Sequence, residues 1–236
     1  MKAKITPDKN RAAAEDLINT IRKRRRRYVA RVNGRDYEIY PDVFSPALVL
    51  DTAWYAKHLP SQKGKSVLEI GAGTGVLAIT AALQGASSVL AVDINPHAVA
   101  NTSANVKRHS VEDVVATHKS DVYKNISIKT TFDTIMWNVP WGDFAHGEKL
   151  NWIQKAFYDP GYTLLRRFVF GAKRRLNKNG TLLIGFSSSI GSEKTLRKYL
   201  KEAGFTCRIR AKNKHRFAVG HPAGPIQVEW FEAKLR

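Results

Sequence analysis

Residues 66–75 read SVLEIGAGTG, and this stretch predicts the fold. An apolar run that contains one acid, Glu69, ends in three glycines at every second position, Gly71, Gly73 and Gly75. An apolar helical pattern over residues 76–84 follows directly. Glycine permits a positive φ and a close approach of the backbone to a ligand. The stretch therefore indicates a strand, a tight turn and a helix, which place backbone N–H groups beside a nucleoside cofactor.

A second acid lies at the end of the next predicted strand. The short apolar strand 90–92 ends in Asp93, and Asn95-Pro96 then opens a helix with Asn95 as N-cap and Pro96 at its first position. An aspartate at this strand tip can accept both ribose hydroxyls of a nucleoside. The spacing from Gly71 also suits an NAD site, although a dinucleotide fingerprint would have Gly or Ala where this chain has Val76.

Two further segments complete the pattern. Residues 132–137 read as a buried strand that ends in Asn138-Val139-Pro140-Trp141. Asp121 follows a short strand at 114–117, and from the residues alone it is either a ligand-binding acid or a solvated loop aspartate.

Together these motifs resemble those of class I S-adenosylmethionine-dependent methyltransferases. The glycines with Glu69 resemble their motif I, and residues 138–141 resemble the Asn-Pro-Pro-aromatic motif of the release-factor glutamine and N6-adenine methyltransferases. The resemblance implies an α/β fold with a Rossmann-like sheet, helices on both faces and an antiparallel C-terminal strand pair, preceded by a basic helix and a β-hairpin. It implies S-adenosyl-L-methionine as cofactor, with these candidate cofactor-binding residues: Glu69, Gly71, Gly73, Gly75, Asp93, Asp121 and Thr52.

The third motif also implies the chemistry, with Asn138, Pro140 and Trp141 as candidate catalytic residues. A planar amide or base nitrogen is a poor nucleophile because its lone pair is delocalised. Acceptors aimed at its N–H bonds can redirect the lone pair and stabilise the charge that develops during transfer. The Asn138 side-chain oxygen and the residue-139 carbonyl are the candidate acceptors, Pro140 holds residue 139 extended, and Trp141 offers a face for stacking. Val139 departs from the family, which has proline there, and we expect a less rigid turn.

The N-terminal part resembles the segment that precedes the cofactor domain in related N-methyltransferases. Strands at 28–32 and 35–39 flank Asn33-Gly34, which is a strong hairpin signal. Phe44, Pro46 and Thr52 loosely match the family segment that walls the active site, and Phe44 and Pro46 are candidate substrate-binding residues. We expect an extension over 1–45 and a methyltransferase domain over 46–236.

The charge of the chain is strongly asymmetric. The net charge is +19, with 12 basic and 3 acidic residues in 1–35, 9 basic and 12 acidic in 36–150, and 18 basic and 5 acidic in 151–236. A polyanion partner explains basic flanks around a slightly acidic centre. A helix that starts at Thr6-Pro7-Asp8 is expected to run into the cations of 22–27, and Arg24 and Arg25 are candidate substrate-binding residues. A basic surface helix with no ligand is the alternative.

The remaining patterns predict regular helices and strands in the C-terminal half of the chain. We expect an amphipathic helix over 164–176, a helix stop and turn at 177–180, a strand over 181–186, a helix from Ser192 to Gly204 and an antiparallel pair at 205–219 and 226–235. The stretch between Trp141 and Tyr162 has no clear period and is the candidate acceptor-binding loop or lid.

Composition excludes several classes. The single Cys207 excludes an intramolecular disulfide and a cysteine metal cluster, no metal-ligand spacing occurs among the histidines, and no apolar run is long enough to span a membrane. With no signal-peptide pattern we expect a cytoplasmic enzyme without a metal.

The expected enzyme would methylate a planar nitrogen of RNA or of a ribosome-associated or other translation-associated protein. The alternatives are a biosynthetic methyltransferase acting on a small metabolite or peptide, and a non-catalytic nucleic-acid-binding protein with this fold.

Overall fold

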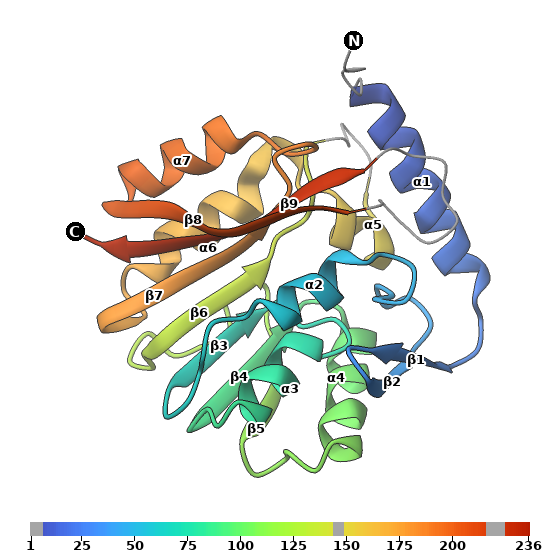
Figure 1. The fold of residues 1–236 in the computed structure, drawn as a ribbon, viewed down its shortest axis with the longest axis horizontal. Coiled ribbons are helices and arrows are strands. Elements are labelled where there is room, and N and C mark those ends of the chain that lie inside the picture. Colours follow the sequence, from blue (N-terminus) through green and yellow to red (C-terminus); the bar gives the residue numbers. More distant parts are fainter. Residues whose placement is uncertain (1–6, 144–148, 216–224) are drawn as a thin grey trace.

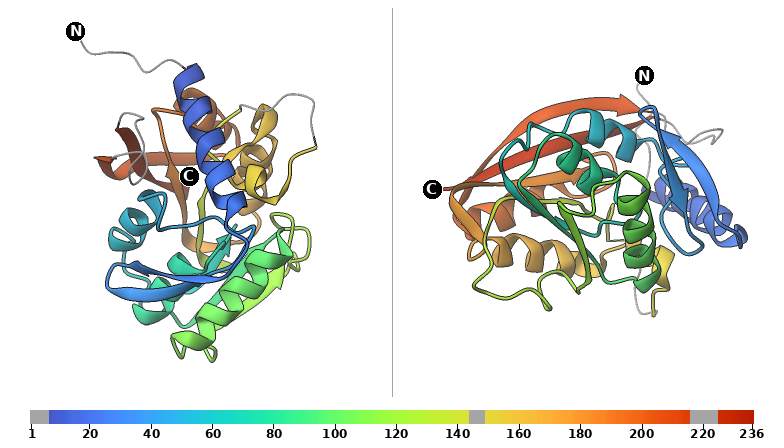
Figure 2. Two further views of the ribbon diagram at one scale, coloured as in Figure 1. Left: turned by 90° about the vertical axis from the view of Figure 1, so that its right-hand side faces the viewer. Right: turned by 90° about the horizontal axis from the view of Figure 1, so that it is seen from below.

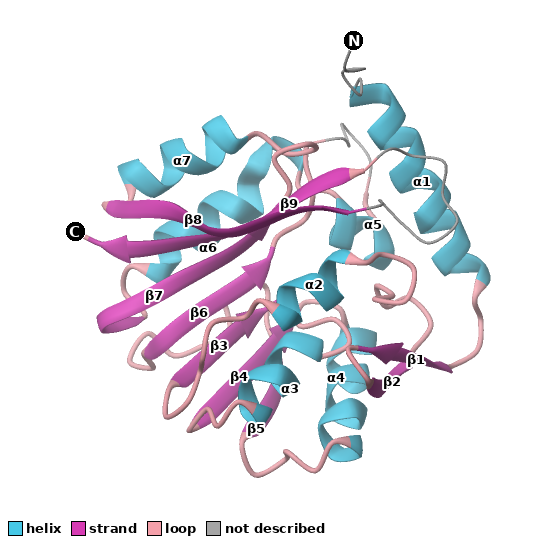
Figure 3. Cartoon of the chain, in the orientation of Figure 1, coloured by secondary structure: helices cyan, strands magenta, loops and turns pink. Residues whose placement is uncertain are grey.

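A seven-stranded sheet forms the centre of the protein in a computed structural model that describes residues 7–143, 149–215 and 225–236 (Figures 1 and 3). Its strand order is β5-β4-β3-β6-β7-β9-β8. The strands are β3 (Ser66–Ile70), β4 (Ser88–Asp93), β5 (Val115–Lys119), β6 (Phe132–Asn138), β7 (Leu176–Phe186), β8 (Phe205–His215) and β9 (Ile226–Leu235). β3 to β7 are parallel, whereas β9 runs antiparallel to β7 and β8 antiparallel to β9. The predicted α/β fold with an antiparallel C-terminal pair is confirmed.

Alternate strand residues face two separate layers of helices, as the period of a β-strand requires. Val67, Met136 and Leu183 face a core shared with α1 (Pro7–Lys23), α2 (Asp51–Lys57), α3 (Val76–Leu83) and α5 (Trp152–Phe157). Leu68, Ile135 and Leu182 face a core shared with α6 (Thr163–Ala172) and α7 (Glu193–Glu202). Figure 2 shows both layers around the sheet. A short 3₁₀ helix, η1 (Pro160–Tyr162), leads into α6.

The order of the strands creates a crevice at one edge of the sheet. From β3 the chain passes through α3 to β4 and through α4 (Pro96–Arg108) to β5, and it then returns to the other side of β3 as β6. In open α/β sheets ligands bind outside the carboxyl ends of the strands at such a switch point. β3, β4 and β6 all direct their carboxyl ends to this edge, so Gly71, Asp93 and Asn138 come to one place.

The N-terminal hairpin is confirmed as a separate two-stranded sheet. β1 (Tyr28–Val32) pairs with β2 (Arg35–Ile39) through Asn33 and Gly34, whose φ values are 48° and 82°. Positive φ at both central residues is the type I′ geometry that matches the twist of the strands. Asn105 of α4 attaches the hairpin to the main sheet by accepting from Glu38 N at 2.7 Å and donating to Glu38 O at 2.9 Å.

Two predicted helix ends are wrong. α1 ends at Lys23, so Arg24–Arg27 lie outside it. A further turn of helix would have stacked like charges on one another, and Arg24 and Arg27 instead lie over tyrosine rings. The predicted cap Thr6 lies outside the described residues.

The second error concerns the end of α6, which stops at Ala172 although the predicted helix continues to 176. Arg175 turns inward and lies over the Tyr123 ring, 4.7 Å from its centroid. Leu176 already pairs with Phe132 as the first residue of β7, and the predicted turn at 177–180 lies within an irregular part of that strand, where Asn179 has a φ of 66°. Residues 216–219 of the other predicted strand lie outside the described residues.

No helix in the described ranges combines the length and the apolar character needed to cross a membrane.

Candidate active site

A cavity of about 400 Å³ opens at the carboxyl ends of β3, β4 and β6. It is lined by segments from both halves of the sheet, by the 42–44 segment after the hairpin, and by α5 and the start of α6. The following predicted site residues line it: Phe44, Thr52, Glu69, Gly71, Gly73, Asp93, Asp121, Asn138, Pro140 and Trp141. Gly75, Pro46, Arg24 and Arg25 are not among its lining residues.

Glycine is needed at each of the three positions of the turn for a different physical reason. All three have positive φ, at 63°, 58° and 81° for Gly71, Gly73 and Gly75. A Cβ on Gly71 would lie 2.4 Å from the Trp137 indole nitrogen, and one on Gly75 would lie 2.8 Å from Cγ2 of Thr102. A Cβ on Gly73 would meet nothing within 4 Å, because this residue faces the open cavity.

The backbone N–H groups of the turn have partners inside the protein. Gly73 N donates to Asp93 Oδ2 at 3.0 Å, Gly75 N to Ala72 O at 2.7 Å, and Ala72 N to Val92 O at 3.0 Å. These hydrogen bonds hold the backbone of the turn and the Asp93 side chain in position in the absence of a ligand.

Glu69 connects β3 to the start of α3. Its side chain is 3% exposed, and Oε2 accepts from Ala78 N at 2.8 Å, which satisfies one of the free N–H groups of the first helical turn. Burial raises the pKa of Glu69 from 4.5 to about 8; the Ala78 hydrogen bond opposes the shift and the nearby Asp93 adds to it. This carboxyl is therefore largely protonated at neutral pH in the folded protein without ligand.

Asp93 is held in place by three backbone donors, from Gly73, Ile94 and Asn95. Besides Gly73 N, Asn95 N donates to Oδ1 at 2.9 Å. Asn95 caps α4 as predicted, because its Oδ1 accepts from His97 N at 3.0 Å, and its Nδ2 donates to Asp42 O at 2.7 Å. Burial raises the pKa of Asp93, against these hydrogen bonds.

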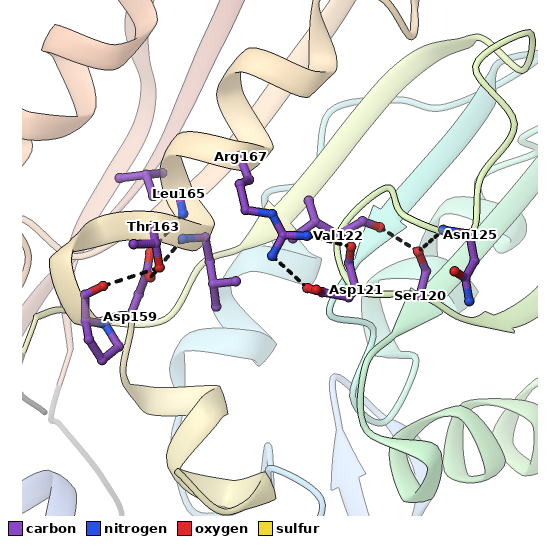
Figure 4. Close-up of polar contacts among 10 residues, drawn as sticks. Ser120, Asp121, Val122, Asn125, Asp159, Thr163, Leu165 and Arg167 are labelled. Atoms are coloured by element: carbon purple, nitrogen blue, oxygen red, sulfur yellow. Dashed lines mark hydrogen bonds and ion pairs between the residues drawn. The ribbon is translucent and has the colours of Figure 1, made fainter. Parts of the chain in front are cut away.

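Asp121 has a partner that the sequence pattern did not indicate. Arg167 of α6 forms an ion pair with it, with 3.0 Å from Nη1 to Oδ1 (Figure 4). Both residues line the cavity.

Asp51, which directly precedes Thr52 in the segment expected to wall the active site, organises the Asn138 motif. Asp51 begins α2 and is 2% exposed. Its Oδ2 accepts from Asn138 Nδ2 at 3.1 Å and its Oδ1 from Thr52 N at 2.6 Å, and the Trp141 side chain also donates to this carboxylate. Burial raises the pKa of Asp51, and these donors counteract the shift. No local pattern marks Asp51 as a partner of Asn138, which lies 87 residues away.

Val139 is anchored in a way that a proline could not be. Its N–H donates to Gly185 O of β7 at 3.1 Å, and its side chain is 3% exposed within the core. Proline has no N–H to donate. The expected loss of rigidity at this position is therefore offset by a hydrogen bond to the neighbouring strand.

Trp141 lies among aromatic residues and is 6% exposed. Its ring meets Phe157 edge-on at 4.8 Å between centroids and Phe44 edge-on at 6.5 Å. Most of the ring is thus packed by the protein, and only a small part faces the cavity. The stacking role of Trp141 stays a prediction.

The described part of the candidate acceptor loop contains α5. Asn151 caps this helix in a capping box with Gln154, and Trp152 and Lys155 line the cavity, with Lys155 Nζ 4.4 Å from the Trp152 ring centroid. The sequence suggested the segment without identifying these two residues. Residues 144–148 of this loop lie outside the described part of the chain.

The arginine run lies away from the cavity lining and next to the segment that walls it. Arg24 lies 4.6 Å from the Tyr28 ring centroid and Arg27 3.9 Å from that of Tyr40. Tyr28 Oη is 2.5 Å from Ser45 Oγ, beside Phe44. Arg25 and Arg26 are exposed.

Within the described ranges, no group of three or more His, Cys, Asp and Glu side chains is placed to hold a metal ion.

Comparison with known proteins agrees with this geometry. The family model for methyltransferase small domains matches residues 39–219. A Methanocaldococcus jannaschii protein, provisionally named a protein N5-glutamine methyltransferase, is 34% identical over 189 residues, which cover 79% of this chain and 92% of that protein.

Two solved structures share the fold. The provisionally assigned methyltransferase SMU.776, complexed with SAH, has a TM-score of 0.64 at 17% identity and covers 87% of this chain and 56% of its own. The T. thermophilus 16S rRNA N2 G1207 methyltransferase, in complex with AdoMet and guanosine, has a TM-score of 0.57 at 22% identity and covers 89% of this chain and 50% of its own. The present chain therefore spans about half the length of these two proteins.

Proposed function

The chain belongs to the methyltransferase small domain family and is an S-adenosylmethionine-dependent methyltransferase, and we propose that it methylates the planar amide nitrogen of a glutamine side chain in a protein substrate. The arrangement of Asn138 at the end of β6 carries this proposal. The name of the M. jannaschii relative supports glutamine as the acceptor.

The residues around the cavity suit the cofactor. Gly73 faces open space, so a ligand can approach the backbone there. In the proposed site Asp93 binds the ribose hydroxyls, Asp121 lies at the adenine end, and Glu69 fixes the turn through α3. The bound cofactor supplies an electrophilic methyl group on a sulfonium.

Asn138 suits the acceptor nitrogen. The Asn138 NH₂ group donates to Asp51, so its Oδ1 faces the other way. In the proposed reaction Oδ1 and the residue-139 carbonyl accept the two N–H bonds of the acceptor amide. The nitrogen lone pair would then be free to attack the methyl carbon as its bond to sulfur breaks and S-adenosylhomocysteine leaves. The same two acceptors would stabilise the positive charge on nitrogen until its proton passes to solvent.

The alternatives predict different geometry or different partners. A non-catalytic protein has no need to hold Asn138, but here three residues donate to one buried carboxylate and Val139 is tied to β7. The exposed Arg25 and Arg26 favour an RNA-bound protein over a small metabolite as substrate, because a polyanion would bind them.

The test is transfer of a labelled methyl group to cell extract divided into protein, RNA and small-molecule fractions. We expect label in protein, with one added methyl group on a glutamine of the labelled peptide. Asn138→Ala should reduce the rate by about 10²-fold and leave the affinity for S-adenosylhomocysteine almost unchanged. Label only in RNA or only in small molecules would overturn the proposed acceptor. A wild-type protein that binds the cofactor but labels no fraction would support the non-catalytic alternative.

A further inference from the structure

We propose that Arg167 determines specificity for the base of the cofactor. Arg167 holds the Asp121 carboxylate so that one of its oxygens stays available to a 6-aminopurine. The Arg167–Asp121 ion pair also links the two sides of the crevice at the end where the adenine is expected to bind. The inference concerns only the cofactor and is independent of the acceptor.

The guanidinium of Arg167 binds Asp121 at two points. Nη1 donates to the carboxylate Oδ1 at 3.0 Å, and Nη2 donates to the Asp121 main-chain oxygen at 3.1 Å (Figure 4). Because the fork engages the side chain and the backbone of one residue, it fixes the rotation of the carboxylate. The two side chains are 45% and 34% exposed, so the pair should add little to folding stability.

The backbone on the Asp121 side is held in a strained turn. Val122 has a φ of 54°, which is unfavourable for a β-branched residue, yet its side chain is buried. Ser120 Oγ stabilises the turn by donating to Val122 O at 2.9 Å and accepting from Asn125 N at 3.2 Å. Figure 4 shows these contacts next to the ion pair. Such strain often occurs at ligand sites, where it keeps a side chain in position.

The start of α6, the helix that carries Arg167, is also held in place by hydrogen bonds. Asp159 is 1% exposed and accepts from Leu164 N at 2.9 Å and from Leu165 N at 2.8 Å, which anchors the first turn of α6. Thr163, Leu164 and Arg167 all line the cavity, because residues three and four positions apart share a helix face.

The ion pair therefore crosses the crevice. Asp121 follows β5 at one edge of the sheet, whereas α6 follows β6 and precedes β7 on the far side of β3 and β4.

The chemistry of this end favours an amino group. Arg167 uses Oδ1 of Asp121, so Oδ2 remains as an acceptor on a residue that lines the cavity. Ile94, Val122 and Leu164 supply apolar lining for a flat ring. The exocyclic amine of adenine can donate to Oδ2, whereas the carbonyl oxygen at the same position of hypoxanthine would face a carboxylate and be repelled.

Calorimetry with S-adenosylhomocysteine and S-inosylhomocysteine tests the proposal on the full chain. The wild type should bind S-adenosylhomocysteine more tightly than S-inosylhomocysteine. Arg167→Gln should weaken the binding of S-adenosylhomocysteine by about 10-fold and reduce the ratio of the two affinities. Arg166→Gln is the matched control, since Arg166 is a neighbouring exposed cation of α6 that lies over Phe170, 4.8 Å from its ring centroid. It should leave both affinities unchanged.

A double-mutant cycle shows whether Arg167 acts through Asp121. Asp121→Asn should also narrow the preference, and the double variant should bind no more weakly than Asp121→Asn alone. Thermal unfolding of ligand-free Arg167→Gln should match that of the wild type, which shows that the variant is folded. Wild-type affinity and preference in Arg167→Gln, or losses that simply add in the double variant, would overturn the proposal.

Discussion

Nδ2 of Asn138 donates a hydrogen bond to Oδ2 of the buried Asp51 at 3.1 Å. The two residues come from β6 and from the start of α2. This contact directs the NH₂ end of the Asn138 amide toward Asp51 and its Oδ1 away from it. Thr52 and Trp141 donate to the same carboxylate, so the orientation of the candidate catalytic amide depends on a residue that does not itself line the cavity.

Asp51→Asn should show whether the orientation of the Asn138 amide affects methyl transfer separately from cofactor binding. The new amide can donate as well as accept, so Asn138 is no longer held in one orientation, and we expect methyl transfer to slow by about 10-fold or more. Affinity for S-adenosylhomocysteine, measured by calorimetry, should stay close to that of the wild type. If Asp51 acts mainly through Asn138, Asn138→Ala combined with Asp51→Asn should be hardly slower than Asn138→Ala alone. Full turnover in Asp51→Asn would exclude this positioning role.

Glu69 should make the stability of the ligand-free protein depend on pH. Its pKa is about 8 in the folded protein and near its ordinary 4.5 when unfolded, so the folded state binds more protons in this interval. The free energy of unfolding should therefore fall as pH rises from 4.5 to 8, by at most about 1.4 kcal/mol per pH unit for this one group. Glu69→Gln should flatten the profile in denaturant unfolding between these limits. An unchanged difference between the wild type and Glu69→Gln across that range would contradict the shift.

Local patterns were sufficient to predict the sheet and the hairpin, and ten of the fourteen predicted site residues line the cavity. Gly71, Asp93 and Asn138 each stand at the end of an apolar run, and parallel strands bring such ends to one edge whatever lies between them. The Asn95 cap and the Asn33-Gly34 turn were predictable because their geometry depends on adjacent residues.

Contacts between distant segments were not predictable. Arg167 and Asp121 are 46 residues apart, and the pair depends on how α6 crosses the crevice. The end of α1 was missed because helical periodicity says nothing of Tyr28 and Tyr40, whose rings attract Arg24 and Arg27. The roles of the site residues in binding and catalysis remain predictions.

The two cavity-lining glycines should respond differently to alanine. In Gly71→Ala the new Cβ would lie 2.4 Å from Trp137 Nε1, at a φ of 63° that alanine disfavours. We expect a loss of folding stability of about 2–4 kcal/mol, from strain and overpacking together. Gly73→Ala has only the strain, about 1–2 kcal/mol, because its Cβ enters open cavity. Thermal unfolding should thus rank Gly71→Ala as the less stable variant.

Ligand binding gives the control for this pair. The Cβ of Gly73→Ala would occupy space at the cavity turn, so S-adenosylhomocysteine should bind this folded variant more weakly than the wild type. Equal stabilities of the two variants, or wild-type affinity in Gly73→Ala, would show that the turn is not used as we propose.

The exposed arginines provide the test of a polyanion partner. Arg24 and Arg27 lie over Tyr28 and Tyr40, so their replacement would also disturb the wall of the cavity. Arg25→Gln with Arg26→Gln removes two charges without touching those aromatic rings. On a single-stranded RNA oligonucleotide, the log–log salt dependence of binding should flatten by about 0.7 for each phosphate that the variant no longer neutralises.

Kinetics and a matched control complete the test. Lys194→Gln with Lys201→Gln removes two exposed charges from α7 and should leave the salt dependence unchanged. With the identified substrate, the arginine variant should raise KM at physiological salt and leave kcat close to that of the wild type, because Arg25 and Arg26 would stabilise ground and transition states alike. A small-metabolite enzyme would behave otherwise, since its turnover should hardly respond to moderate salt or to either double variant. Equal salt slopes for the arginine and lysine variants would mean that the charge acts only through the overall field of the protein, and the run 24–27 would then be ordinary surface.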